Sequence, residues 1–192
     1  MNVPLQAHTP HKHHLKRHLQ QMQSNISNMT IRTSSLDDLP QMKRIFASAR
    51  QFMVSTGNPN QWAADYPSDS LLREDIESGT SHVVVENGNI VATFVLRSGN
   101  DPTYDRIYQG AWPNNEPYAT IHRIASNGQA KGIFHLAVCH ARQHCRNIRI
   151  DTHRDNIVMQ HAIMKEGFRY CGVIHCWNGS ERLAYQLVGD KE

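Results

Sequence analysis

A short glycine-containing loop in the middle of the chain has residue types that bind anions. The loop reads Asn-Gly-Gln-Ala-Lys-Gly over residues 127–132 and follows a segment, 118–125, that is predicted to be a strand. A helix is predicted from about residue 131 to residue 146. Free backbone amides at the start of a helix and the helix dipole both favour a negatively charged ligand. Lys131 adds a full positive charge, so the loop is a candidate phosphate-binding site.

The elements around this loop predict where its ligand lies. The segment 118–125, the helix and a further predicted strand at 147–151 form a βαβ unit, which makes the two strands parallel with a right-handed crossover. Ligands of such units lie beyond the carboxyl ends of the strands, at the start of the crossover helix. The motifs GxGxxG and GxxxxGK[ST] are absent from the sequence. Their absence argues against an ordinary dinucleotide and against a Walker-type nucleoside triphosphate.

Two residues that can carry charge, His122 and Arg123, lie in the middle of the predicted strand 118–125. A buried parallel strand is normally an apolar run, so the presence of these two residues needs an explanation. His122 could be a general base, because the reference pKa of histidine is about 6.5. The other open interpretation is a core histidine that is hydrogen-bonded to a backbone group or a carboxylate. Arg123 is interpreted as a structural partner of Asp151 or Glu86. Strict alternation predicts one face with Tyr118, Thr120, His122 and Ile124, and another with Ala119, Ile121, Arg123 and Ala125.

The rest of the chain alternates predicted helices and strands. Ser35 and Asp38 form a capping-box pattern that opens a first helix, and Ser68 is the predicted N-cap of a second. Asn87-Gly88, between two β-branched runs, predicts a hairpin. The other predicted elements are strands at 30–33, 82–86, 90–97, 170–174 and 182–187, a helix at 156–166, and an irregular excursion at 99–117.

Composition argues against several classes of protein. The net charge of +3 comes from residues 1–29, which contain three basic residues and no acid, so the remainder is neutral and shows no nucleic-acid footprint. No apolar run is long enough to span a membrane. The four cysteines lack CxxC spacing, which predicts reduced thiols and a cytoplasmic location. Residues 1–28 hold five histidines and little apolar material, so we predict a disordered tail there and a single domain at 29–192.

Three motifs, taken together, resemble the GNAT superfamily of N-acetyltransferases. The residues Gln129-Ala130-Lys131-Gly132-Ile133 are similar to its Q/R-x-x-G-x-G/A loop. Asn156 and the pair Gly167-Phe168 stand where the superfamily has an Asn-led helix that ends in Gly-Phe. The string over residues 148–172 also resembles a subgroup of uncharacterised bacterial acetyltransferases. The resemblance extends from residue 29 to about residue 187.

The resemblance implies an α/β fold with a mixed, mostly antiparallel twisted sheet, a splayed parallel strand pair and flanking helices. It implies acetyl-CoA as cosubstrate and direct attack of a primary amine on the thioester in a ternary complex. The implied cofactor-binding residues are Ile124, Ala125, Gln129, Ala130, Lys131, Gly132, Ile133, Phe134 and Asn156. Two positions depart from the pattern. Phe134 replaces a Gly or Ala of the pyrophosphate loop, and Ile163 replaces the Tyr that in many members protonates the leaving thiolate.

Under the same resemblance His122 is the candidate general base, with Glu116 acting through water and His153 as alternatives. The candidate acceptor-binding residues are Trp62, Tyr66, Tyr108, Trp112 and Asp151. The aromatic members of that set are equally open to interpretation as lids on the core. The expected partner is a small-molecule amine or a protein amino group, and a homodimer is common in the superfamily.

Two other functions stay open at this point. The missing Tyr allows a non-catalytic module that senses acyl-CoA, and the histidine-rich tail allows an interaction domain with a metal-binding arm. Inside the domain no metal site is predicted. His140 and His144 have the i, i+4 spacing of a metal pair but lack a third ligand, so we interpret them as a solvated helix face.

Overall fold

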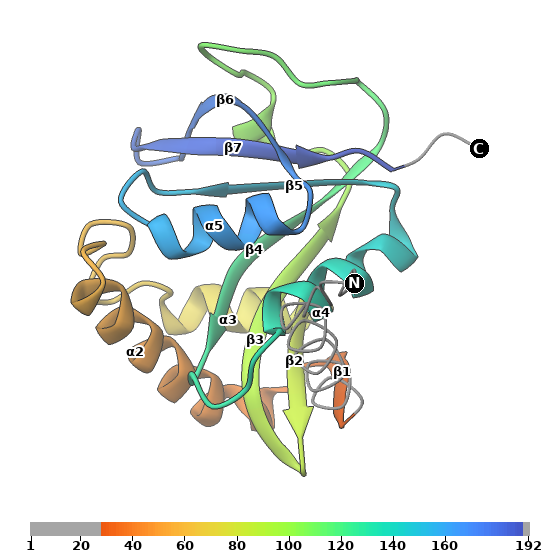
Figure 1. Cartoon of the computed structure of the whole chain (residues 1–192). Helices are drawn as coiled ribbons and strands as arrows, with labels where there is room; N and C mark the ends of the chain where they lie inside the picture. The colour runs from red at the N-terminus through yellow and green to blue at the C-terminus, as the bar shows by residue number, and fades with distance from the viewer. Residues whose placement is uncertain (1–27, 190–192) are drawn as a thin grey trace, which may run out of the picture.

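The computed structural model describes residues 28–189, in which seven strands form one sheet (Figure 1). The strands are β1 (Met29–Thr33), β2 (Ser81–Glu86), β3 (Asn89–Ser98), β4 (Tyr118–Ser126), β5 (Asn147–Thr152), β6 (Arg169–His175) and β7 (Glu181–Leu187). Their order is β1-β2-β3-β4-β5-β7-β6, and among these strands only β4 and β5 pair in parallel. The predicted mixed, mostly antiparallel sheet is confirmed. The predicted tail at 1–28 lies, apart from Asn28, outside the described residues.

Local capping decides where the helices begin. They are η1 (Leu36–Asp38), α2 (Leu39–Ser55), α3 (Asp69–Glu77), η2 (Pro102–Tyr104), α4 (Ile133–His144) and α5 (Ile157–Lys165). The Ser68 hydroxyl accepts a hydrogen bond from the amide of Leu71, and the Asn156 side-chain oxygen accepts one from the amide of Met159. Helix α4 starts later than predicted because Gly132, its N-cap, has a left-handed backbone with φ 81°. The η2 turn lies in the stretch that was predicted to be irregular.

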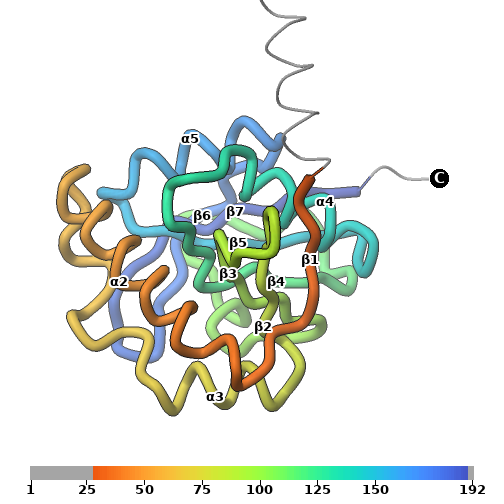
Figure 2. The backbone as a smooth tube through the Cα atoms, turned by 90° about the horizontal axis from the view of Figure 1, so that it is seen from below, coloured from red at the N-terminus to blue at the C-terminus, as the bar shows by residue number. Residues whose placement is uncertain are grey.

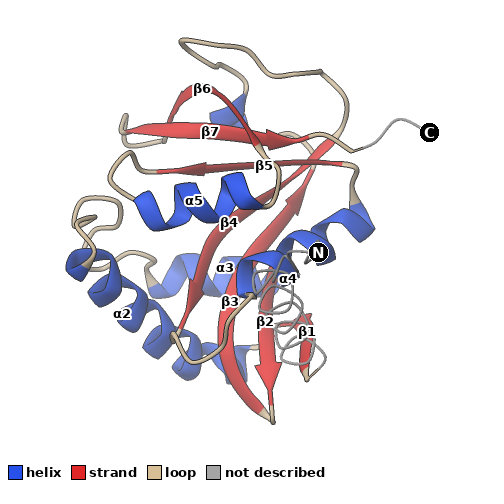
Figure 3. Cartoon of the chain, in the orientation of Figure 1, coloured by secondary structure: helices blue, strands red, loops and turns tan. Residues whose placement is uncertain are grey.

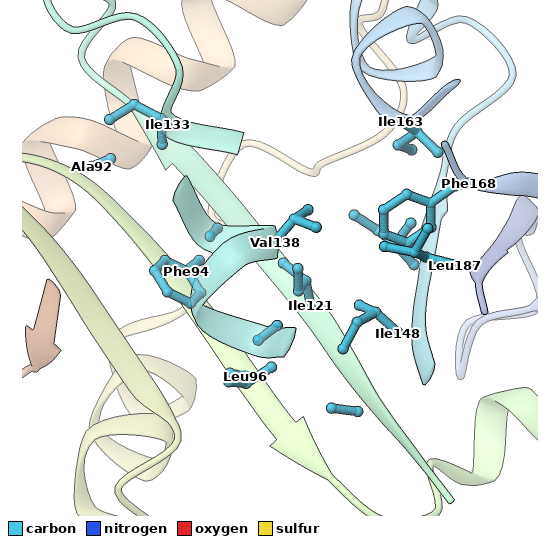
Figure 4. Close-up of a cluster of buried hydrophobic side chains, with 14 of the residues drawn as sticks. Ala92, Phe94, Leu96, Ile121, Ile133, Val138, Ile148, Ile163, Phe168 and Leu187 are labelled. Atoms are coloured by element: carbon cyan, nitrogen blue, oxygen red, sulfur yellow. The ribbon is translucent and has the colours of Figure 1, made fainter. Parts of the chain in front are cut away.

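Two apolar clusters hold the helices to the two faces of the sheet. Helices α2 and α3 pack on one face, where Phe46 and Leu72 meet Val83 of β2. Helices α4 and α5 contribute Val138 and Ile163 to the cluster on the other face. Figure 2 shows the sheet between these layers, and Figure 4 shows the second cluster around Ile121 and Val138. None of the described helices is long and apolar enough to cross a membrane.

The parallel strands β4 and β5 stay paired over a short distance only. Tyr118, Ala119 and Thr120 pair with Asn147, Ile148 and Arg149. Beyond that point β4 continues beside β3 and β5 continues beside β7, so the two strands diverge (Figures 1 and 3). The backbone groups that face the gap lose their ladder partners, and a ligand can enter the sheet there. The predicted splayed pair is confirmed.

A bulge in β4 breaks the predicted alternation of its side chains. Arg123 has a left-handed backbone with φ 48°, and the pairing of β3 with β4 shifts by one residue between Thr93 and Val95. An extra residue at a bulge moves every later side chain to the opposite face. Ile124 therefore packs with the cluster that contains Ala119 and Ile121, although strict alternation had put it on the face of His122.

Candidate active site

A cleft of about 320 Å³ opens at the end of β4 that no longer pairs with β5. It lies between the end of β4, the start of α4, the first half of α5 and one side of α2. Five of the nine predicted cofactor-binding residues line it, namely Ile124, Ala125, Ile133, Phe134 and Asn156. Apolar residues such as Met53 and Met159 form much of the remaining wall. The cleft can therefore enclose an extended, mostly apolar arm.

The other four predicted residues, Gln129, Ala130, Lys131 and Gly132, form the loop beside this cleft and do not line it. The Asn127 side-chain oxygen accepts a hydrogen bond from the amide of Gln129, so that amide is already occupied. In the described part of the chain, the amides of residues 130–134 donate to no protein acceptor. They precede the first full turn of α4 and form a nest suited to an anion.

Phe134 has a packing role that explains its departure from the superfamily pattern. Its ring lies 6.1 Å from the ring of Phe168, centroid to centroid, and it packs against the cluster beneath α4. The same side chain lines the cleft. A small residue there would leave a gap between α4 and Phe168, so the bulky side chain at position 134 belongs to the core as well as to the cleft.

Ile163, at the position of the superfamily Tyr, is completely buried and belongs to the cluster under α4 and α5. We expect Ile163→Tyr to lower the free energy of unfolding by about 1–3 kcal/mol, because the core has no space for the ring. Its hydroxyl would add the cost of an unpaired polar group. A urea titration measures the loss, and Ile163→Leu is the volume-conserving control. An unchanged stability together with a faster acetyl transfer would contradict this expectation.

A second cavity, of about 420 Å³, lies next to the first. Both are lined by Met53, Ile124, Asn156 and Met159, which therefore stand at the junction. Three of the predicted acceptor-binding residues, Trp62, Tyr66 and Asp151, line the second cavity, as does His122. The rings of Trp62 and Tyr66 lie 5.8 Å apart and form an aromatic wall. His122 thus lines a cavity that shares four lining residues with the apolar cleft.

His122 is held in this cavity by a carboxylate. Its Nε2 atom lies 2.8 Å from Oδ2 of Asp101, and its side chain is 17% exposed. The other Asp101 oxygen accepts hydrogen bonds from the amide and the hydroxyl of Thr103. Burial opposes ionisation of Asp101, but the hydrogen bonds from His122 and Thr103 outweigh it and keep the pKa of that carboxyl below its usual range. An ionised Asp101 accepts a hydrogen bond from the protonated Nε2 atom of His122. The lone pair of Nδ1 is then available to take a proton.

Asp151 also lines this cavity and belongs to a second polar pair. Its Oδ1 atom accepts a hydrogen bond of 2.7 Å from the hydroxyl of Tyr104, and Nε of Arg182 lies 4.0 Å from its Oδ2 atom. Burial and the adjacent carboxylate hold the pKa of Tyr104 well above its usual range, so that hydroxyl stays protonated. Tyr104 therefore acts as a hydrogen-bond donor that fixes Asp151.

The structure places the other predicted residues elsewhere. Glu116 is exposed ahead of β4 and accepts a hydrogen bond from Asn147. His153 lies against Asp155, with 3.4 Å between its Nδ1 atom and the carboxylate. The Trp112 indole donates to the carbonyl of Tyr104 and packs in the small cluster around that ring. Tyr108 bridges to β6. None of these four side chains lines either cavity.

The partner of Arg123 differs from both predicted partners. Its guanidinium contacts both carboxylate oxygens of Asp75 on α3, at 2.7 and 2.9 Å. Asp75 has no exposed side-chain surface and also lies 3.3 Å from Nη2 of Arg97. The interpretation of Arg123 as a structural residue agrees with this pair. The predicted partners Asp151 and Glu86 were wrong, because the bulge turns Arg123 towards α3.

His140 is less solvated than predicted, whereas His144 is exposed as predicted. The His140 ring lies 5.1 Å from that of His82 and 4.9 Å from that of His144. Burial lowers the pKa of both His82 and His140. Among residues 28–189 no group of three or more metal-ligating side chains has the arrangement needed to hold an ion.

Sequence reasoning missed several residues of the second cavity, among them Asp101 and Arg97. Asp101 precedes Pro102, and an Asp before a Pro is a helix N-cap signal that indicates η2. That signal gives no hint of a bond to His122, which is 21 residues away. Arg97 follows a β-branched run and looks like an ordinary strand end.

Comparison with solved structures identifies the family. An acetyltransferase of the GNAT family from Streptococcus agalactiae is 31% identical, with a TM-score of 0.77, over 85% of this chain and 96% of that one. An N-acetyltransferase from Staphylococcus aureus (17% identical, TM-score 0.56) and a Salmonella typhimurium protein solved with acetyl-CoA (14%, 0.53) share the fold. They cover 84% and 86% of this chain and 98% and 96% of their own. Comparisons with family models and with curated proteins gave no match. The chain belongs to the GNAT family of acetyltransferases.

Proposed function

We propose that this protein transfers an acetyl group from acetyl-CoA to a primary amine by direct attack in a ternary complex. The observation that supports this most is the junction of the two cavities. An apolar cleft at the end of β4 shares lining residues with a more polar cavity that contains a histidine–aspartate pair. A thioester in the first and an amine in the second would meet beside Met159 and Ile124, which line both.

The residues around the cleft fit acetyl-CoA. The amides of residues 130–134 and the start of α4 would receive the pyrophosphate, and exposed Lys131 would add a positive charge. The apolar walls would enclose the pantetheine arm, whose amides would pair with the backbone that β4 exposes after it leaves β5. The Salmonella typhimurium structure with acetyl-CoA has the same fold.

Each chemical requirement of the transfer has a candidate group in this chain. An alkylamine with a pKa of about 10 must lose a proton before or during attack. Nδ1 of His122 can accept it, while Asp101 stabilises the imidazolium that forms. The leaving CoA thiolate resembles a cysteine thiolate, with a pKa of about 8.5, so it departs without strong acid catalysis. An aliphatic residue at position 163 is compatible with this chemistry.

We expect Gly132→Asp to weaken acetyl-CoA binding by at least about tenfold, or about 1.4 kcal/mol. The new carboxylate would lie in the nest that receives the pyrophosphate. Isothermal titration calorimetry measures the affinity. Gly132→Asn is the matched control, because Asn has the same size, tolerates the left-handed backbone of position 132 and lacks the charge. Equal acetyl-CoA affinities for the Asp and Asn variants would show that the pyrophosphate does not bind at this loop.

The proposed function is tested by the release of free CoA thiol from acetyl-CoA across a library of amines, with the N-acetylated product identified by mass spectrometry. Turnover with one or more amines is the expected result. Tight acetyl-CoA binding without turnover of any amine would favour the acyl-CoA-sensing alternative, which the aliphatic residue at position 163 permits. Absence of acetyl-CoA binding would reject both.

A further inference from the structure

We propose that Arg97 forms a carboxylate-binding subsite in the second cavity, so that the acceptor is an amino acid and not a simple alkylamine. This inference rests on the proposed acetyl transfer and names the class of acceptor. It depends on the balance and the placement of charges around His122.

One corner of the cavity carries an excess of positive charge. Arg97 and Arg123 both line the cavity, and the two guanidiniums share a single carboxylate, that of Asp75. Arg123 takes both oxygens at 2.7 and 2.9 Å, so Arg97 is left with one longer contact of 3.3 Å. Two positive charges against one negative charge leave this corner with a net charge of +1.

The other charged groups of the cavity do not cancel this excess locally. Asp101 is engaged by His122 and Thr103, and Asp151 is engaged by Tyr104 with Arg182 beside it. The cavity is therefore bipolar. Its positive corner lies at Arg97, and its negative charge lies at Asp101 beside His122.

Arg97 has free donors and access to the cavity. Its side chain is 41% exposed, whereas that of Arg123 is 11% exposed. Within the described residues, the contact to Asp75 is the single hydrogen bond of the Arg97 guanidinium. The planar fork of arginine matches the two oxygens of a carboxylate.

The sheet places Arg97 beside the candidate base. Val95 pairs with His122 and Arg97 pairs with Thr120 across β3 and β4, so Arg97 and His122 share one face. They are diagonal neighbours at a backbone separation of about 7–8 Å, a distance that two long side chains reduce at their tips. A molecule whose amine and carboxylate are separated by one or a few carbon atoms can contact both. The aromatic wall of Trp62 and Tyr66 is left for its side chain.

The experiment compares each proteinogenic amino acid with its decarboxylated amine in the thiol-release assay, for example phenylalanine with 2-phenylethylamine and arginine with agmatine. For the preferred pair we expect the amino acid to have at least about tenfold higher kcat/KM, the effect of one charge-assisted hydrogen bond. Arg97→Gln should raise KM for the amino acid by a similar factor and leave kcat/KM for the decarboxylated amine within about twofold. Arg73→Gln removes the same charge from the exposed side of α3, outside both cavities, and is the matched control.

The outcomes separate this inference from the proposed function. Two results would overturn the carboxylate subsite while leaving the acetyltransferase activity supported. One is a kcat/KM for the decarboxylated amines that equals or exceeds that for the amino acids. The other is an equal effect of Arg97→Gln on both classes of substrate. No turnover of any amine rejects the transferase. In that case calorimetry tests the subsite by comparing the affinities of phenylalanine and 2-phenylethylamine for the CoA-loaded protein. Arg97→Gln is expected to abolish the preference for phenylalanine. The absence of such a preference in the unmodified protein overturns the inference.

Discussion

Replacing His122 by alanine is expected to lower kcat for acetyl transfer by roughly 10²-fold or more, the usual contribution of a general base. The affinity for acetyl-CoA should hold, because His122 lines the second cavity and not the apolar cleft at the end of β4. Steady-state kinetics at neutral pH measure kcat, and calorimetry measures the affinity. A loss confined to kcat is the signature of a group that acts in the transition state.

Asp101→Asn is the companion to this variant. It keeps the size of the side chain but removes the negative charge that orients Nε2 of His122 and stabilises its protonated form. We expect a smaller fall in kcat than for His122→Ala. Both variants should fold with a lowered melting temperature, because each removes one member of a largely buried pair. Near-normal turnover of His122→Ala would show that the base is another group. Glu116 and His153, the alternatives from the sequence, line neither cavity. Unfolding of that variant would identify His122 as a core residue.

Replacing Asp75 by asparagine is expected to lower the free energy of unfolding by about 3–5 kcal/mol, because the change leaves a buried guanidinium without its counter-charge. The Asp75 side chain is inaccessible to solvent, and Arg123 is almost as deeply buried. Domains of this kind are stable by about 5–15 kcal/mol, so the loss would be a large part of the total. Chemical denaturation followed by fluorescence measures it.

The same helix supplies the control. Asp69 pairs with Lys43 at the surface, and both side chains are half-exposed or more. Asp69→Asn should cost about 1 kcal/mol or less, because solvent screens an exposed pair. A loss below about 1 kcal/mol for Asp75→Asn as well would mean that Arg97 and Arg123 do not depend on that carboxylate. The bulge at Arg123 would then need another explanation.

The sequence by itself determined the features that depend on a few adjacent residues. Asn87-Gly88 indicated the hairpin between β2 and β3, and Ser68 and Asn156 indicated the starts of α3 and α5. The glycine-containing segment 127–132 indicated the loop between β4 and α4. The order of these elements implied the parallel β4–β5 pair, and their motifs led to the family that the structural comparison confirmed. Turns and helix caps depend on a few adjacent residues, so they can be predicted without the tertiary structure.

Tertiary structure alone decided which side chains meet. The bulge at Arg123 depends on the pairing of β4 with β3, and it reversed the face of Ile124 and directed Arg123 to Asp75, 48 residues away. The contact of His122 with Asp101 arises because η2 folds back over β4, and no spacing in the sequence encodes that return. Contacts between distant segments depend on register and on helix packing, which are properties of the whole sheet. For that reason the loop was predictable, while the groups around His122 were not.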